Sequence, residues 1–185
     1  MIFVIWAIVF VAGIWLISSY NGLVTLRLRV DNGWRRIDAQ LKRRCELIPN
    51  LLESVKGCMQ IEPEMVQKVI AARSQALAQK GVKESADAQV ALTQSLGKVF
   101  ALMENYPELK SNRNVLDLQE ELTGAESRIA LAGQSYNDLV NQYNAKRQGF
   151  PAKMIAGFFH FQPSDLFNLP KPEKALPKVD LRLPS

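Results

Sequence analysis

Cysteine and histidine are scarce in this chain of 185 residues, which has two cysteines and one histidine. Cys45 and Cys58 are thirteen residues apart in the sequence, and His160 is more than 100 residues from either. Metal sites need ligands at short, characteristic spacings, and disulfide-rich domains need several cysteine pairs. The sequence therefore predicts no metal site and no bound cofactor. We expect two ordinary thiols in the core or on the surface, with a single disulfide between them as the alternative.

Sequence motifs of catalysis are also missing. The chain has no glycine-rich phosphate loop, and its Ser, His, Asp and Glu residues show no spacing typical of a catalytic triad or of paired carboxylates. No segment alternates apolar and polar residues in the way of a half-buried β-strand. We therefore expect an all-α protein that is not an enzyme, with no catalytic residues and no small-molecule substrate.

Lysine and arginine are absent before Arg27, and positions 2 to 17 are apolar without a break. A helix needs about 20 mostly apolar residues to span a bilayer, and Ser18, Ser19 and Tyr20 extend the segment to that length. We predict that residues 1–20 form a transmembrane anchor with Tyr20 at the level of the lipid headgroups. Two alternatives remain. A cleaved signal peptide would need a basic start and an Ala-x-Ala site, which are missing here, and the segment could also be a buried helix of a soluble protein.

The distribution of positive charge predicts the orientation of this anchor. Seven basic residues follow it: Arg27, Arg29, Arg35, Arg36, Lys42, Arg43 and Arg44. Because basic residues favour the cytoplasmic side of a membrane, we expect the N-terminus outside and the rest of the chain in the cytoplasm, with the opposite orientation still open. The net charge of +5 suits anionic lipid. Nucleic acid is not expected, because the cations spread around the helix and Trp34 lies on its apolar stripe.

Beyond residue 20, apolar residues recur at alternating spacings of three and four, which is typical of helices that pack along one stripe. Connections of modest length between four such stretches predict that residues 21–161 form an antiparallel, coiled-coil-like four-helix bundle of long helices. The first of them continues the anchor as one rod. Residues 162–185 contain five prolines, so we expect a Pro-rich tail that is disordered or extended.

The limits of the four helices follow from prolines and capping residues. Pro49 predicts a turn or kink after the first helix, and Pro63 predicts a kink or the start of a new helix. Residues 80–87 are typical of a loop. The third helix is expected to have Ser85 or Asp87 as its N-cap and to end at Pro107. The fourth is expected to have Ser111, Asn112 or Asn114 as its N-cap and to end near Gly149.

Three features of these helices leave alternatives open. Arg27 and Arg44 fall on the apolar stripe, where an arginine is costly unless it is paired. Glu121 and Glu126 are candidate partners, although Arg27 can also lie where the stripe opens to water. The third feature is an aromatic patch that either closes the bundle or contacts lipid or a neighbouring subunit, and it consists of Met154, Ile155, Phe158, Phe159 and Phe161.

Several motifs together resemble those of a known family. They are Tyr20-Asn21, Trp34, Lys42-Arg43-Arg44, Leu47-Ile48-Pro49-Asn50-Leu51, Tyr106-Pro107, Glu126-x-Arg128-Ile129-Ala130, Tyr136-Asn137, Tyr143-Asn144 and Phe150-Pro151. Over roughly residues 15 to 161 the chain resembles the LemA family of bacterial membrane proteins. The resemblance implies an N-terminal membrane segment, a long antiparallel helical bundle, and no established catalytic residues. It also implies a role at membranes, since family members are linked with membrane metalloproteases and envelope stress.

We therefore expect a non-enzymatic, single-pass protein of the bacterial inner membrane that acts as a scaffold or adaptor. Its partners would be the bilayer and either another membrane protein or further copies of itself. The alternatives are a lipid-organising or membrane-remodelling oligomer and a regulatory partner of a membrane protease. The candidate interaction residues are Asp38, Gln40, Lys42, Arg43, Asn50 and Lys56. A simpler interpretation is a solvated helix face with local pairs such as Asp38 with Lys42.

Overall fold

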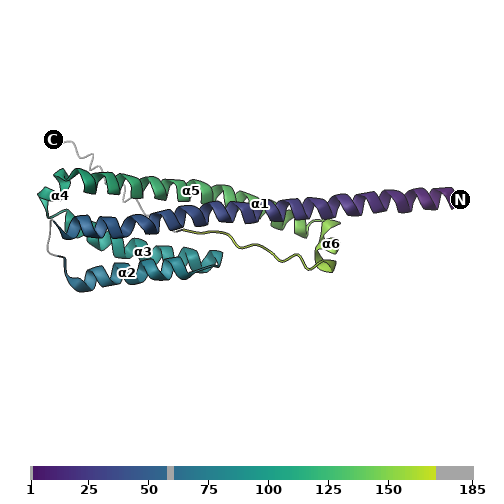
Figure 1. The fold of residues 1–185 in the computed structure, drawn as a ribbon. Coiled ribbons are helices and arrows are strands. Elements are labelled where there is room, and N and C mark those ends of the chain that lie inside the picture. Colours follow the sequence, from purple (N-terminus) through teal and green to yellow (C-terminus); the bar gives the residue numbers. More distant parts are fainter. Residues whose placement is uncertain (1, 58–60, 170–185) are drawn as a thin grey trace, which may run out of the picture.

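The protein is described by a computed structural model, which covers residues 2–57 and 61–169 (Figure 1). No strand occurs among these residues, so the prediction of an all-α fold with long packed helices is confirmed. The helices are α1 (Ile2–Lys56), α2 (Pro63–Ala78), α3 (Val82–Met103), α4 (Pro107–Ser111), α5 (Arg113–Gln148) and α6 (Ala152–Phe158).

Helix α1 is 55 residues long, which corresponds to about 82 Å at 1.5 Å per residue. Its N-terminal part extends alone past the other helices, and its remaining part lies beside α5, which runs in the opposite direction (Figure 1). The prediction that the N-terminal segment and the first packed helix form one rod is confirmed. Counted over the described side chains alone, which leave out those at positions 8, 9 and 12 of α1, no helix is both long enough and apolar enough to cross a membrane.

Helix α1 continues through Pro49 to Lys56, so of the two predictions for this residue, a turn or a kink, the turn is wrong. Proline has no N–H, and the carbonyl oxygen of Cys45, four residues earlier, therefore loses its helical donor. The side chain of Arg73 on α2 replaces it, because its Nε donates to that oxygen at 2.7 Å. A neighbouring helix thus supplies the missing hydrogen bond.

The start of α2 at Pro63 agrees with one of the two predictions for this residue. The loop predicted at residues 80–87 is shorter than expected, because α3 begins at Val82 and Ser85 is already buried inside it. Gly81 is the N-cap in place of Ser85 or Asp87, and an extended glycine serves well there. Asn112, one of the three predicted candidates, caps α5, since its side chain accepts hydrogen bonds from the backbone of the first turn.

The buried side chains form two apolar clusters. The distal core lies between α2, α3, α4 and the adjoining parts of α1 and α5, and it includes Ile48 and Leu96. The proximal core lies nearer to the N-terminal end of α1, and it includes Leu23 and Tyr136. Most residues of the apolar stripes on the predicted third and fourth helices, such as Leu96 and Tyr136, are buried in one of these two cores.

The chain leaves α6 through His160, which has a left-handed φ of 54°. The N–H of Phe161 donates to Ala156 O at 2.9 Å and that of His160 to Gly157 O at 3.4 Å, a pattern that closes the helix as a Schellman motif. Residues 161–169, which we call the strap, then return along α1 and α5 without regular secondary structure (Figure 1). The side chains of Phe161 and Phe167 are buried in the proximal core.

The strap extends the packed part of the chain past residue 161, where the sequence suggested a boundary between bundle and tail. Residues 162–169 have no helix or strand, as expected for an extended segment, but side chains of α5 bind their backbone. The rest of the predicted tail, residues 170–185, lies outside the described residues.

Candidate functional site

The six candidate interaction residues all lie on α1, over a length of about 27 Å at 1.5 Å per residue. Four of them are exposed, namely Lys42, Arg43, Asn50 and Lys56, while Asp38 and Gln40 are half-buried. Within the described part of the chain, the one hydrogen bond or ion pair between members of this group joins Lys42 Nζ to Asp38 Oδ2 at 2.7 Å. The group is therefore a stretch of helix surface and not a pocket.

Two of these residues have partners or surroundings that the sequence did not reveal. The Arg43 guanidinium lies 3.6 Å from the carboxylate of Glu121 on α5, and both side chains are exposed. Such a pair contributes at most about 1 kcal/mol. Gln40 Oε1 is buried, and it has no hydrogen-bond partner among the described residues. The interaction role of the group stays a prediction.

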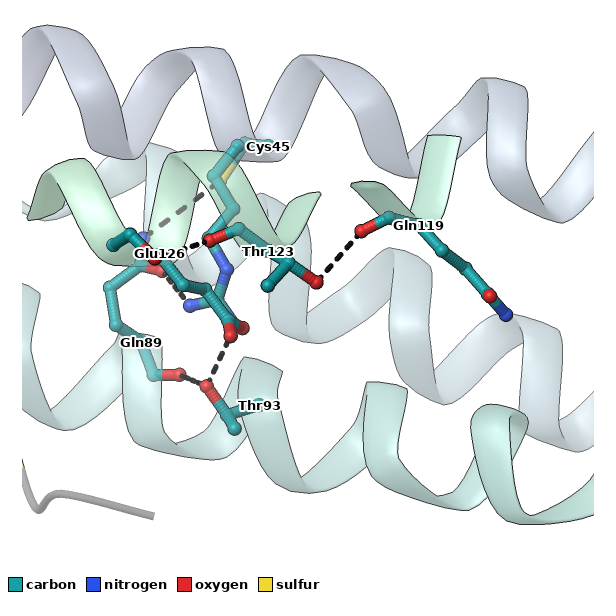
Figure 2. A network of polar contacts seen from close by, with 8 residues as sticks. Cys45, Gln89, Thr93, Gln119, Thr123 and Glu126 are labelled. Carbon is teal, nitrogen blue, oxygen red and sulfur yellow. Dashed lines mark hydrogen bonds and ion pairs between the residues drawn. The ribbon is translucent and has the colours of Figure 1, made fainter. Parts of the chain in front are cut away.

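A polar network around Arg44 joins three helices between the two cores. Figure 2 shows Gln89 and Thr93 of α3 and Glu126 of α5 converging at this point. The Arg44 side chain is buried, and its Nη1 donates to Gln89 Oε1 at 2.9 Å. Its Nη2 donates to Thr93 Oγ1 at 2.9 Å and to Glu126 Oε1 at 2.7 Å. The pairing of Arg44 with Glu126, foreseen as one of two options, is confirmed, and Arg27 lies exposed.

Cys45 follows Arg44 directly and is buried beside the same network. Burial raises the pKa of its thiol, while a hydrogen bond from Gln89 and the nearby Arg44 lower it. A raised pKa reduces the thiolate fraction at neutral pH and so reduces reactivity. Cys45 is a free thiol, as one of the two predictions had it, whereas Cys58 lies outside the described residues.

Two asparagines of α5 hold the strap by its backbone. Asn137 donates to Phe167 O at 3.0 Å and accepts from Phe167 N at 2.8 Å. Asn144 donates to Ser164 O at 2.9 Å and accepts from Ser164 N at 3.1 Å. An asparagine amide carries both a donor and an acceptor, so each side chain satisfies both polar groups of one extended residue.

A tyrosine precedes each of these asparagines and binds the same strap. Tyr136 donates its hydroxyl to Asp165 O at 2.9 Å, and Tyr143 donates to Gln162 O at 2.8 Å. Burial raises the pKa of Tyr136 to about 12, with the charges of Asp165 and Asp31 adding to the effect. Burial also raises the pKa of Tyr143. Both hydroxyls therefore stay protonated and remain donors at physiological pH.

The spacing of these contacts explains why the strap fits the helix. The two Tyr-Asn pairs are seven residues apart on α5, which is about 10.5 Å at 1.5 Å per residue. Their backbone partners are three residues apart in the strap, which is about 10 Å in an extended chain. This heptad repeat of Tyr-Asn is a signal in the sequence for the binding positions on α5, but it does not specify which segment of the chain returns to them. The sequence alone places Tyr136 and Tyr143 on the apolar stripe of the fourth helix, and it gives the two pairs as motifs of the family resemblance.

The N-terminal part of α1 presents large apolar side chains to the surroundings. Among its described side chains, Phe3 is 89% exposed and Phe10 is 70% exposed, and the first buried residue is Leu23. Tyr20 lies at the end of this stretch, where its ring centroid is 4.8 Å from that of Phe159. The structure therefore places Tyr20 where the apolar segment meets α6, and its membrane role stays a prediction.

A hollow of about 370 Å³ lies between α3, α4 and α5, and its lining is largely apolar with Glu104 and Glu126 as the two acidic residues. The Glu126 carboxylate is already bound by Arg44. Within residues 2–57 and 61–169, no three or more His, Cys, Asp or Glu side chains gather closely enough to hold a metal ion.

Comparison with known proteins identifies the family of this chain. The family model of the LemA family matches residues 33–181, a range that includes the strap and both Tyr-Asn pairs. A similar protein is Protein LemA of Metamycoplasma hominis, which is 24% identical over 155 residues. That match covers 83% of this chain and 68% of the mycoplasma protein. The chain therefore belongs to the LemA family.

Proposed function

We propose that this protein is held at a bacterial cell membrane by the N-terminal part of α1, and that its packed helices are a non-enzymatic scaffold for another membrane protein or for a second copy of the chain. The supporting observation is the exposed apolar segment that projects beyond the other helices (Figure 1). Monomeric soluble proteins rarely expose apolar patches of this extent, and such patches indicate membrane or protein contacts.

The dimensions of the segment fit a single crossing of a bilayer. Residues 2–20 are about 28 Å long as a helix, and a bilayer has a hydrocarbon core about 30 Å thick. Trp15 and Tyr20 lie toward one end of the segment, and both residue types favour the interface between hydrocarbon and water. In the sequence the apolar residues Ile8, Val9 and Ala12 complete this segment, and their side chains lie outside the described ones. The proposed form of attachment is therefore one helical crossing.

The proposed orientation places the N-terminus outside and the packed helices in the cytoplasm. Its support is the charge distribution, because the first basic residue is Arg27 and several more follow on α1. A cysteine added after Ser185 tests this orientation. It should resist labelling by a membrane-impermeant reagent in intact cells and become labelled after lysis, and labelling in intact cells would reverse the proposed orientation.

The attachment is tested by alkaline carbonate extraction of membranes from cells that express the full chain. The wild type should stay in the pellet, and Phe3→Asp combined with Phe10→Asp should move most of the protein into the supernatant, because each buried charge opposes insertion. The matched control is Leu116→Asp with Leu131→Asp, at two exposed leucines of α5, which should change nothing. Equal release of both variants, or release of the wild type, would contradict the proposal.

The scaffold role is tested by recovery of partners from detergent-solubilised membranes. Charge reversal at Lys42 and Arg43 should abolish recovery of a specific membrane protein, or of a differently tagged second copy. Charge reversal at Lys98, which is exposed on α3, is the control. If the Lys42 and Arg43 variant recovers the same proteins in the same amounts as the wild type, this face of α1 is not the interaction surface.

A further inference from the structure

The short helix α6 and the residues that flank it expose a set of large apolar side chains. Ile155 and Ala156 are buried against the proximal core. In contrast, Phe150 is 85% exposed, and Met154, Phe158 and Phe159 are also exposed. The sequence left open whether this patch closes the bundle or faces outward. The structure divides it, so that one face closes the proximal core and the other is uncovered.

The uncovered face of α6 is continuous with the apolar segment of α1. The ring centroids of Trp15 and Phe150 are 6.5 Å apart, and those of Tyr20 and Phe159 are 4.8 Å apart. Trp15 and Tyr20 are about 7.5 Å apart along the helix axis. The contact therefore falls where the unbroken apolar run ends and the first polar residues of α1 begin.

The charges around this junction are of one sign. Residues 1–30 and 146–161 contain no Asp or Glu. They contain Arg27, Arg29, Lys146, Arg147 and Lys153. Lys146 lies directly over Gly22 of α1, where its amine would meet any added Cβ. An aromatic face bordered by cations fits the headgroup region of an anionic bilayer, where aromatic rings and basic residues are both favoured.

We infer that the exposed face formed by Phe150, Met154, Phe158 and Phe159 lies in the headgroup region of the bilayer that α1 enters, as a second membrane contact. This inference rests on the proposed membrane attachment. The partner is a lipid surface with anionic headgroups. With two contacts in place of one, α1 and the helices packed on it have a fixed tilt and rotation relative to the membrane.

The inference is tested on the full chain reconstituted in vesicles of phosphatidylcholine with phosphatidylglycerol. An environment-sensitive fluorescent amino acid is introduced at position 5 in the apolar segment, 158 on α6 or 116 on α5, all exposed sites. Lipids with a nitroxide on the headgroup, or with bromine in the acyl chain, quench the probe according to its depth. We expect bromine to quench position 5, nitroxide to quench position 158, and neither to quench position 116.

The anionic part of the inference has its own readout at position 158. Vesicles without phosphatidylglycerol, and the variant Lys153→Glu, should lower the fraction of protein in which position 158 is docked on the bilayer. The equilibrium constant for docking should fall about fivefold for each basic side chain that no longer meets an anionic headgroup. Lys98→Glu on α3 is the control.

Quenching at position 5 without quenching at 158 overturns the inference and leaves the membrane attachment intact. The same result with a blue shift at 158 that grows with protein concentration would mean that a second copy covers this face. Failure at position 5 contradicts the membrane attachment itself.

Discussion

The distal and proximal cores are closed in different ways, although α1 and α5 contribute to both. In the distal core, α2, α3 and α4 cover α1 and α5 with the apolar faces of further helices. In the proximal core, α3 contributes only its first turns, through Val82 and Ala86, and the rest of the cover is α6 and the strap. The helical cover depends on repeated apolar residues. The strap combines two buried phenylalanines with hydrogen bonds from a few polar side chains of α5, each to a particular backbone group.

Substitution of Arg44, at the junction between the two cores, has the largest expected effect on the free energy of unfolding. Arg44→Met removes three hydrogen bonds and leaves Gln89 Oε1 buried without its charged donor. We expect the free energy of unfolding to fall by about 3 to 4 kcal/mol, measured by urea denaturation of the protein in detergent. Arg43→Met removes only an exposed, 3.6 Å pair and should cost less than about 0.5 kcal/mol. Similar losses for the two variants would mean that the network does not join the cores.

Substitutions that release the strap have the second-largest expected effect, and they test whether the proximal core can be weakened without the distal core. Asn137→Ala combined with Asn144→Ala removes four hydrogen bonds between α5 and the strap backbone. We expect a loss of about 2 to 3 kcal/mol, together with faster hydrogen exchange in residues 161–169 and unchanged exchange in α2 and α3. Asn141→Ala is the control, because Asn141 is exposed on the same helix. Faster exchange throughout the distal core as well would show that the two cores do not respond separately.

Alkaline pH should weaken the proximal core in particular. The pKa of Tyr136 is raised to about 12, so the folded protein keeps its phenol proton where the unfolded chain has lost it. The resulting stabilisation is complete below about pH 10 and is lost as the pH rises through 12. Between pH 9 and 12 we expect the wild type to lose about 1 to 2 kcal/mol more than Tyr136→Phe, since lysine titration is common to both. Identical pH profiles would show that the hydroxyl has no such linkage.

The sequence predicted the distal core better than the proximal one for a physical reason. Apolar side chains at spacings of three and four identify a helix face, and Leu92, Leu96 and Val115 are buried as that pattern requires. The strap has no period, and its contacts depend on a return of the chain that no local pattern specifies. Within the described residues, the fold of long helices was therefore predictable, whereas the Arg73 contact at Pro49 and the cover of the proximal core were not.

The contact at Pro49 allows a test within the distal core. Arg73→Ala removes the donor to Cys45 O, and we expect it to cost about 1 kcal/mol. In a chain with Pro49→Ala the backbone N–H of residue 49 can make that bond, so the same substitution should cost much less. The measurement is a double-mutant cycle of unfolding free energies. Equal costs in both backgrounds would mean that Arg73 does not replace the bond that proline removes.

Two helical glycines give the smallest and most direct comparison of the two cores. A Cβ on Gly97 of α3 would meet no atom within 4 Å, whereas a Cβ on Gly133 of α5 would lie 3.1 Å from the Phe167 ring of the strap. Gly97→Ala should therefore gain nearly the full helix propensity difference, up to about 1 kcal/mol. Gly133→Ala starts from the same gain but must push Phe167 outward, so its net effect should be smaller or reversed. If both variants gain equally in urea denaturation, the strap gives way freely and does not constrain α5. If Gly133→Ala gains less, and that difference disappears when Asn137 and Asn144 are also replaced by alanine, the polar contacts hold Phe167 against the helix.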